Sequence, residues 1–307
     1  MIKIIFLSLF LFVSDVFAWE PTRPVVVTIA YSPGSGNELL FRKAASIINR
    51  SHNINFVIEF KPGANEVVGT NYFDSNARND GHSLFVPAIG VWIANPAWYK
   101  KILTVDVMKF EPVVNLGETS LALYTHYDNP IDTPTKFVTM LKSGKNTTIG
   151  TGAAAHVLAY QYIINQSKTS NTERIQYTSP SLVAQAVASK EIEYGITPLS
   201  MALEWEKAKK IKIIGVTALN RTMNKPKLDT VFPGLDLVGQ VGIVVPNGTN
   251  QEIINYWNKL FSDAVKTKEY QSFLDEISWQ HTIGDYRKFI GDMRNRWLPI
   301  AEALPFN

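Results

Sequence analysis

Short apolar runs alternate with segments of helical spacing along this chain, and this order limits the folds that it can adopt. Residues 25–31 are rich in β-branched side chains and predict a strand, and apolar residues within 40–48 then recur at the spacing of a helix packed on a sheet. A strand at 55–60, a helix through 68–73 and a strand at 83–88 continue the pattern. Strands alternating with helices in this way predict a parallel sheet.

A second series of the same kind follows later in the chain. It comprises predicted strands at 147–150, 174–177, 192–197 and 212–217, and predicted helices at 154–165, 182–189 and 201–207. Extended apolar segments at 111–127 and 238–246 flank this series, and helices at 251–266, 269–276 and 285–303 end the chain. The chain is therefore expected to cross twice between two α/β units.

The first residues differ in composition from the rest. Lys3 precedes a short apolar run, and Val16, Phe17 and Ala18 come before a polar, proline-bearing segment. This is the layout of a secretory signal peptide, with small residues near the cleavage site. The apolar run is about half as long as a membrane-spanning helix needs to be. We expect cleavage after residue 18, with a retained anchor as the alternative.

Composition excludes several classes of function. The 307 residues include no cysteine, so disulfides, thiolate metal sites and a cysteine nucleophile are excluded. A net charge of +3 is too small to indicate a nucleic-acid partner. The five histidines show no metal-binding spacing and no serine lies in a nucleophile elbow, so neither a metal, a cofactor nor an enzyme is expected.

The turn after the first strand, Pro33-Gly34-Ser35-Gly36, is typical of a loop that holds an anion. Glycines let backbone N–H groups and the start of the next helix face a ligand at the carboxyl ends of parallel strands. Leu39 stands where a dinucleotide fingerprint needs glycine, and no phosphate-loop lysine follows. The alternative is a tight turn with no ligand.

Two later turns raise the same question. Gly63-Ala64 ends the second strand, where close helix packing is an equal explanation, and Gly150-Thr151-Gly152 leads into the second unit's first helix. His156 on that helix could contact a ligand or serve as a base, although a structural role is the other possibility. Turns from two units could face each other across a cleft, an arrangement that suits binding more than catalysis.

Several segments together resemble the substrate-binding receptors of tripartite tricarboxylate transporters, the Bug receptors. Members open with a Trp-Pro-x-Pro-Val-like segment and a Pro-Gly-Gly turn with an Asp, here WEPTRPVVVTIAYSPGSGNE. A Lys-Pro-Gly-Ala-x-Gly-x-x-Gly turn is here KPGANEVVGT, and an Asp-Gly-Tyr-Thr-Leu-like strand entry is here NDGHSL. A Pro-Val segment, a Gly-x-Gly-Ser-x-x-His turn and a Pro-rich loop follow as FEPVVNLG, GTGAAAH and NKPKLDTVFPGLD.

The resemblance implies a two-lobed periplasmic-binding-protein fold of type II, with two parallel-type mixed sheets flanked by helices. Lobe 1 would comprise residues 19–125 and 236–307, and lobe 2 residues 126–235. The protein would be a periplasmic monomer that captures a small organic acid or an amino-acid-like carboxylate and presents it to membrane transporter subunits. A receptor for a sensory system and a secreted enzyme on this fold are the alternatives.

The resemblance also suggests which residues contact the ligand. They are Tyr31, Ser32, Gly34, Ser35, Gly36, Asn37, Ala64 and Ile89 on lobe 1, and Gly150, Thr151, Gly152, Ala153, His156 and Thr197 on lobe 2. The chain departs from the family pattern at Ser35 (usually Gly), Glu38 (Asp), Ala153 (Ser) and Thr197 (Asp). These changes predict retained binding of an acid whose body is less polar than that of citrate.

Overall fold

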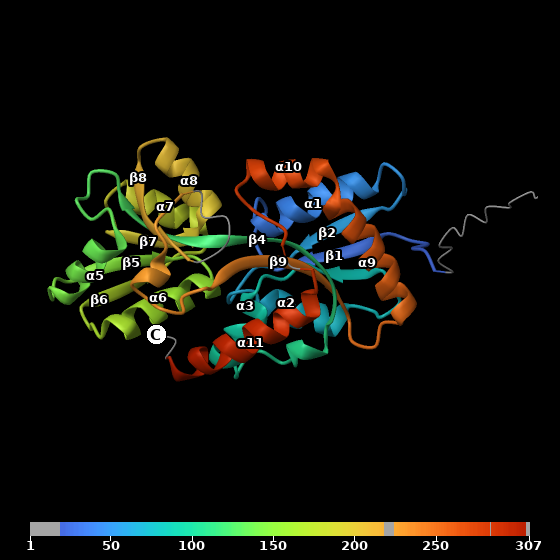
Figure 1. Cartoon of the computed structure of the whole chain (residues 1–307). Coiled ribbons are helices and arrows are strands. Elements are labelled where there is room, and N and C mark those ends of the chain that lie inside the picture. The colour runs from blue at the N-terminus through green and yellow to red at the C-terminus, as the bar shows by residue number, and fades with distance from the viewer. Residues whose placement is uncertain (1–18, 218–223, 283, 305–307) are drawn as a thin grey trace, which may run out of the picture.

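The computed structural model describes residues 19–217, 224–282 and 284–304, and it is a mixed α/β protein (Figure 1). The predicted signal peptide lies outside the described residues. The strands of the protein are β1 (Val25–Ile29), β2 (Phe56–Phe60), β3 (Ser83–Phe85), β4 (Glu111–His126), β5 (Thr147–Thr151), β6 (Thr172–Gln176), β7 (Tyr194–Pro198), β8 (Ile211–Val216) and β9 (Val238–Val245). None of the described helices is long and apolar enough to span a membrane.

The helices alternate with the strands much as the sequence predicts. They are α1 (Gly36–Ile48), α2 (Val67–Asn76), α3 (Gly90–Ile93), α4 (Asn95–Trp98), α5 (Pro134–Lys142), α6 (Ala154–Ser167), α7 (Pro180–Ala188), α8 (Leu199–Lys207), α9 (Gln251–Lys266), α10 (Lys268–Glu276) and α11 (Tyr286–Ala303). The helices α3, α4 and α5 were not predicted. The first two are single turns, which are too short to show helical periodicity.

Two groups of parallel strands are set side by side in Figure 1. In the β1 group, β1 pairs in parallel with β2 and β3. In the β5 group, β5 pairs in parallel with β6 and β7. Both groups follow from the strand-helix-strand order, because a helical crossover returns the chain in the same direction.

The long strands β4 and β9 join the two groups. The first half of β4 pairs with β9, which in turn pairs with β3, and the second half of β4 pairs with β7 and β8, all antiparallel. Eight of the nine strands therefore form one continuous path, with β8 paired to β4 off this path, rather than the two separate sheets that we predicted. The cause is the length of β4, whose 16 residues are enough to pair with both groups.

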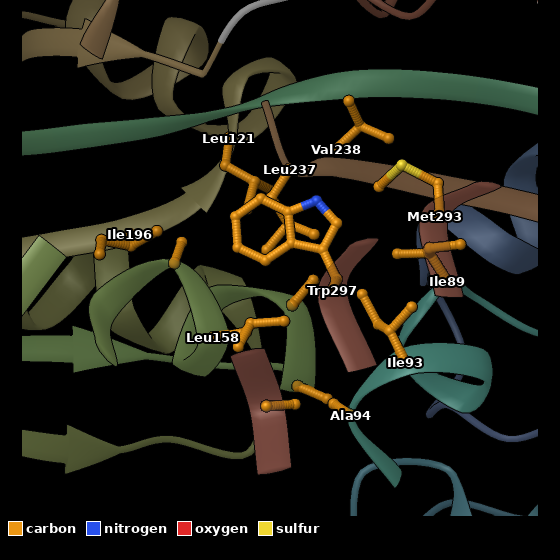
Figure 2. Packing of buried hydrophobic residues seen from close by; sticks show 14 of the residues in the cluster. Ile89, Ile93, Ala94, Leu121, Leu158, Ile196, Leu237, Val238, Met293 and Trp297 are labelled. Atoms are coloured by element: carbon orange, nitrogen blue, oxygen red, sulfur yellow. The ribbon is translucent and has the colours of Figure 1, made fainter. Parts of the chain in front are cut away.

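A single apolar cluster also runs from one group to the other. Ile89, Ile93 and Ala94 from the β1 side and Leu158 and Ile196 from the β5 side surround the buried Trp297 of α11 (Figure 2). Burial of one such side chain contributes about 1.5–3 kcal/mol. The last helix of the chain thus holds both groups together beneath the ends of their strands.

Candidate functional site

The two groups meet where the segments after β3 and β5 begin their helices. A Cβ built on Gly90, at the start of α3, would lie 2.9 Å from Ala154 Cβ and 4.0 Å from Ala155 N, both at the start of α6. It would lie 3.8 Å from Oε2 of Glu66, which precedes α2. Three helix starts, each beyond the carboxyl end of a strand, therefore border one small region.

The start of α6 brings backbone N–H groups to this region. Its N-cap residue Ala153 has an extended backbone and no side-chain capping bond, and the first bonds back to the Ala153 carbonyl come from His156 N and Val157 N. The first N–H groups of a helix are unsatisfied unless something caps them, and they carry the positive end of the helix dipole. This is a suitable environment for an anion.

His156 is buried beneath the same helix start. It is 3% exposed, and its Nδ1 has no hydrogen-bond partner among the described residues. Burial lowers the pKa of its imidazole to about 3, so the ring is neutral at ordinary pH. His156 is consequently not a source of positive charge for an anion.

The polar groups of the Pro33-Gly34-Ser35-Gly36 turn form hydrogen bonds with the helix that follows it. Gly34 N donates to Glu38 Oε2 at 2.7 Å, and Ser35 Oγ caps α1 by accepting from Glu38 N at 3.4 Å. Arg42 Nε donates to the other oxygen of Glu38 at 2.6 Å. Burial alone would raise the pKa of Glu38, but the Gly34 N–H and the Arg42 guanidinium lower it. The predicted anion turn is thus occupied in part by a carboxylate from its own helix.

Trp279 lies between this turn and the β5 group. A Cβ built on Gly36 would lie 3.2 Å from the indole ring, and the indole Nε1 donates to Ser200 Oγ, in the first turn of α8, at 3.1 Å. The side chain is 7% exposed. Trp279 therefore links the two groups at a second place, apart from the contact at Gly90.

We expect this link to help hold the groups together. Both Trp279→Phe and Ser200→Ala remove the same hydrogen bond, so each should lower the free energy of unfolding by about 1 kcal/mol. The double variant should lose about as much free energy of unfolding as either single variant, because the hydrogen bond can be lost only once. Chemical denaturation of the wild type, the two single variants and the double variant measures this. Fully additive losses would show that the bond does not couple the two residues.

The structure distributes the predicted ligand residues unequally. Tyr31, Ile89, Ala153 and His156 lie around or beside the Gly90 region, whereas Asn37 donates its Nδ2 to Val86 O at 2.8 Å within the β1 group. Ser32, Gly34 and Ala64 are exposed, and Ser35 and Gly36 are half-buried. The first four lie on turns after β1 and β2, and Gly36 begins α1.

The remaining predicted residues pack inside the β5 group. A Cβ on Gly150 would lie 2.5 Å from Ile192, and one on Gly152 would lie 2.8 Å from the backbone of Ser179 and Pro180. Thr151 Oγ1 donates to Gln176 Oε1 at 3.2 Å, and Thr197 Oγ1 to Pro198 O at 3.4 Å. Close packing explains both glycines, and a ligand role for these four residues stays a prediction.

Sequence reasoning missed three residues that lie where the two groups meet. Glu66 is buried beside Gly90 although it follows an ordinary-looking turn, and its place in KPGANEVVGT, where the related pattern has glycine, was the available sign. Arg174 on β6 lies near Tyr99, which follows α4. Trp279 gave no sign, because its contacts depend on how the last helices return to the sheet.

Comparison with known proteins defines the class. The sequence pattern that defines the tripartite tricarboxylate transporter family receptors matches residues 40–306. The chain therefore belongs to this family, whose members are binding proteins and not enzymes. Protein BugT of Bordetella pertussis is 21% identical over 297 residues, covering 92% of this chain and 89% of BugT.

Solved structures share the fold. MatC of Rhodopseudomonas palustris with bound malate has a TM-score of 0.81 at 19% identity, covering 92% of this chain and 100% of MatC. The R. palustris protein Rpa4515 with adipate has a TM-score of 0.83 at 17% identity, covering 93% and 99%. The periplasmic binding protein BugD has a TM-score of 0.81 at 16% identity, covering 92% and 98%.

Proposed function

We propose that this protein is a periplasmic receptor that binds a small organic carboxylate between the β1 and β5 groups and presents it to a membrane transporter. The observation that carries the proposal is the uncapped start of α6 facing Gly90 across the junction of the two groups. Family membership and the acids named with the similar structures, malate and adipate, support it.

The carboxylate would accept hydrogen bonds from the first amides of α6. Each hydrogen bond to a charged group contributes roughly 1.5–3 kcal/mol, so two amides are enough for useful affinity. Ala153 supplies no hydroxyl here, but the backbone N–H groups of Ala154 and Ala155 are unaffected by that change. The apolar Ile89 beside them favours a ligand with a less polar body than citrate.

Binding in this place requires the groups to separate and close again. We infer two lobes, residues 19–125 with 236–307 and residues 126–235, that move about β4 and β9, where the chain crosses between them. Closing around a ligand by hinge motion is a common switch in two-lobed proteins. The predicted transporter subunits would recognise the closed form of a monomer.

A thermal-shift screen of the chain without residues 1–18 tests the function. Mono-, di- and tricarboxylates, amino acids and aromatic acids should include at least one that raises the melting temperature. A ligand at one hundred times its Kd adds about 2.7 kcal/mol of stability, which is a shift of several degrees. If no acid moves the midpoint while the protein melts cooperatively, carboxylate capture is the wrong function.

A further inference from the structure

The turn after β2 ends in a strained backbone. Three successive residues other than glycine, Ala64, Asn65 and Glu66, have φ values of 46°, 50° and 75°. This left-handed region costs a residue with a side chain on the order of 1–2 kcal/mol. Hydrogen bonds hold it in place, because Asn65 Nδ2 donates to Tyr99 Oη and Asn95 Nδ2 donates to Asn65 O, each at 2.7 Å.

The strained turn places a carboxyl group at the junction of the two groups. Glu66 is 1% exposed, its Oε1 accepts from Ala88 N at 2.9 Å, and its Oε2 accepts from Tyr31 Oη at 3.3 Å. Oε2 is also the atom 3.8 Å from the Cβ position on Gly90. The side chain therefore lies where the proposed ligand would bind.

This carboxyl group has few partners for a buried acid. A carboxylate can accept about four hydrogen bonds, and Glu66 receives two. Burial raises its pKa to about 8, only partly offset by the Ala88 N–H and Tyr31, and no cation among the described residues lowers it. A buried acid of this kind gains most from a partner that brings a positive charge.

The start of α6, across the junction from Glu66, favours negative charge. The start of α6 presents amide groups and the positive end of a 14-residue helix, with Ala155 N bordering the same Gly90 position as Glu66. Arg174 adds a cation on the β5 side, where its Nη1 donates to Thr151 Oγ1 at 3.4 Å. An acid on one wall and anion donors on the other match a molecule with both charges.

We propose that Glu66 makes this protein a receptor for amino acids or similar zwitterions, with the ligand ammonium paired to Glu66 and the ligand carboxylate at the start of α6. The proposal rests on the proposed function of carboxylate binding and specifies its ligand class. An acid without an amino group would bring no cation to Glu66, so this carboxyl group would stay protonated and form no ion pair with the ligand.

Pairing with an ammonium should also release a proton. Glu66 is largely protonated at pH 7 in the free protein, and a cation favours its ionised form. The neighbouring titratable groups do not interfere, because burial raises the pKa of Tyr31 and of Tyr286 on α11 far above this range, and the pKa of His156 is about 3. The proton should therefore come from Glu66.

Calorimetric titrations with matched pairs test the inference. Aspartate and succinate, glutamate and glutarate, alanine and propionate, and phenylalanine and 3-phenylpropionate differ in each pair by the amino group. At least one amino acid should bind at pH 7 ten times more tightly than its partner or better, and titrations in buffers of different ionisation enthalpy should show proton release.

Three variants complete the experiment. Glu66→Gln should abolish both the preference and the proton release, and Glu66→Gly, which suits the left-handed backbone, should do the same without strain. Glu59→Gln, on β2 beside Lys61, is the control and should keep both. Tighter binding of the acids without an amino group would overturn the inference and leave carboxylate binding intact. Failure of all four amino acids to bind, while another acid from the thermal-shift screen does bind, would likewise overturn this inference and leave carboxylate binding intact.

Discussion

Gly90→Val should weaken ligand binding about tenfold or more. Any side chain at this position meets the Ala154 Cβ at 2.9 Å and approaches Glu66 and Ala155, so valine would hold the two groups apart at the proposed site. Overpacking a buried contact costs roughly 1–3 kcal/mol. We expect affinity for the acid found in the screen to fall about tenfold or more in calorimetry, since about 1.4 kcal/mol corresponds to a factor of ten.

A second glycine provides the matched control. Gly291 also lies in a helix, α11, but a Cβ built on it has no atom within 4 Å. Gly291→Val therefore introduces the same helical side chain without the contact, and ligand affinity should stay within about twofold. Equal loss of affinity in both variants would mean that valine acts through general destabilisation and not through the junction at Gly90.

The second large effect is on the pH dependence of stability. The pKa of Glu66 is raised to about 8 in the folded protein by burial, whereas an unfolded glutamate titrates near 4.3. Between these values the folded state holds a proton that the unfolded state has lost. This contribution is fully present below about pH 4 and disappears as the pH rises towards 8.

Denaturant unfolding at a series of pH values measures this effect. The free energy of unfolding of the wild type should fall, relative to that of Glu66→Gln, by up to about 1.4 kcal/mol per pH unit between pH 5 and 7.5. Relative to Glu38→Gln, the free energy of unfolding of the wild type should instead rise with pH. The reason is that the pKa of Glu38 is lowered in the folded protein, so the stability that Glu38 contributes is lost on acidification. Parallel curves for wild type and Glu66→Gln would show that Glu66 is ionised in the folded protein.

The secondary structure was predictable from the sequence wherever a segment was long and periodic. The helix predicted over 251–266 is observed as α9 (Gln251–Lys266), and the extended segment at 111–127 is β4 (Glu111–His126). The missed helix α5 had local signs as well: Thr133 caps it, Pro134 occupies its first turn, and Phe137 and Leu141 are buried one turn apart.

The arrangement of the candidate site was less predictable, because it depends on contacts between distant segments. The glycines of the turn at 34–36 suggested an anion site, but the pattern could not show that Glu38 bonds the Gly34 N–H. Similarly, nothing near Trp279 in the chain indicates that it contacts Gly36 and Ser200. Glu66 had a sign in the sequence, since it stands where the related pattern has glycine, but its position opposite α6 depends on the left-handed backbone of the turn.

Binding of an acid and of its uncharged amide tests the central claim most directly. The wild-type chain without residues 1–18 should bind one molecule of the acid found in the screen. It should bind the corresponding primary amide at least ten times more weakly, because the proposed site would bind a charged carboxylate through the backbone N–H groups at the start of α6. Equal affinity for acid and amide, measured by calorimetry at pH 7, would contradict carboxylate capture between the two groups.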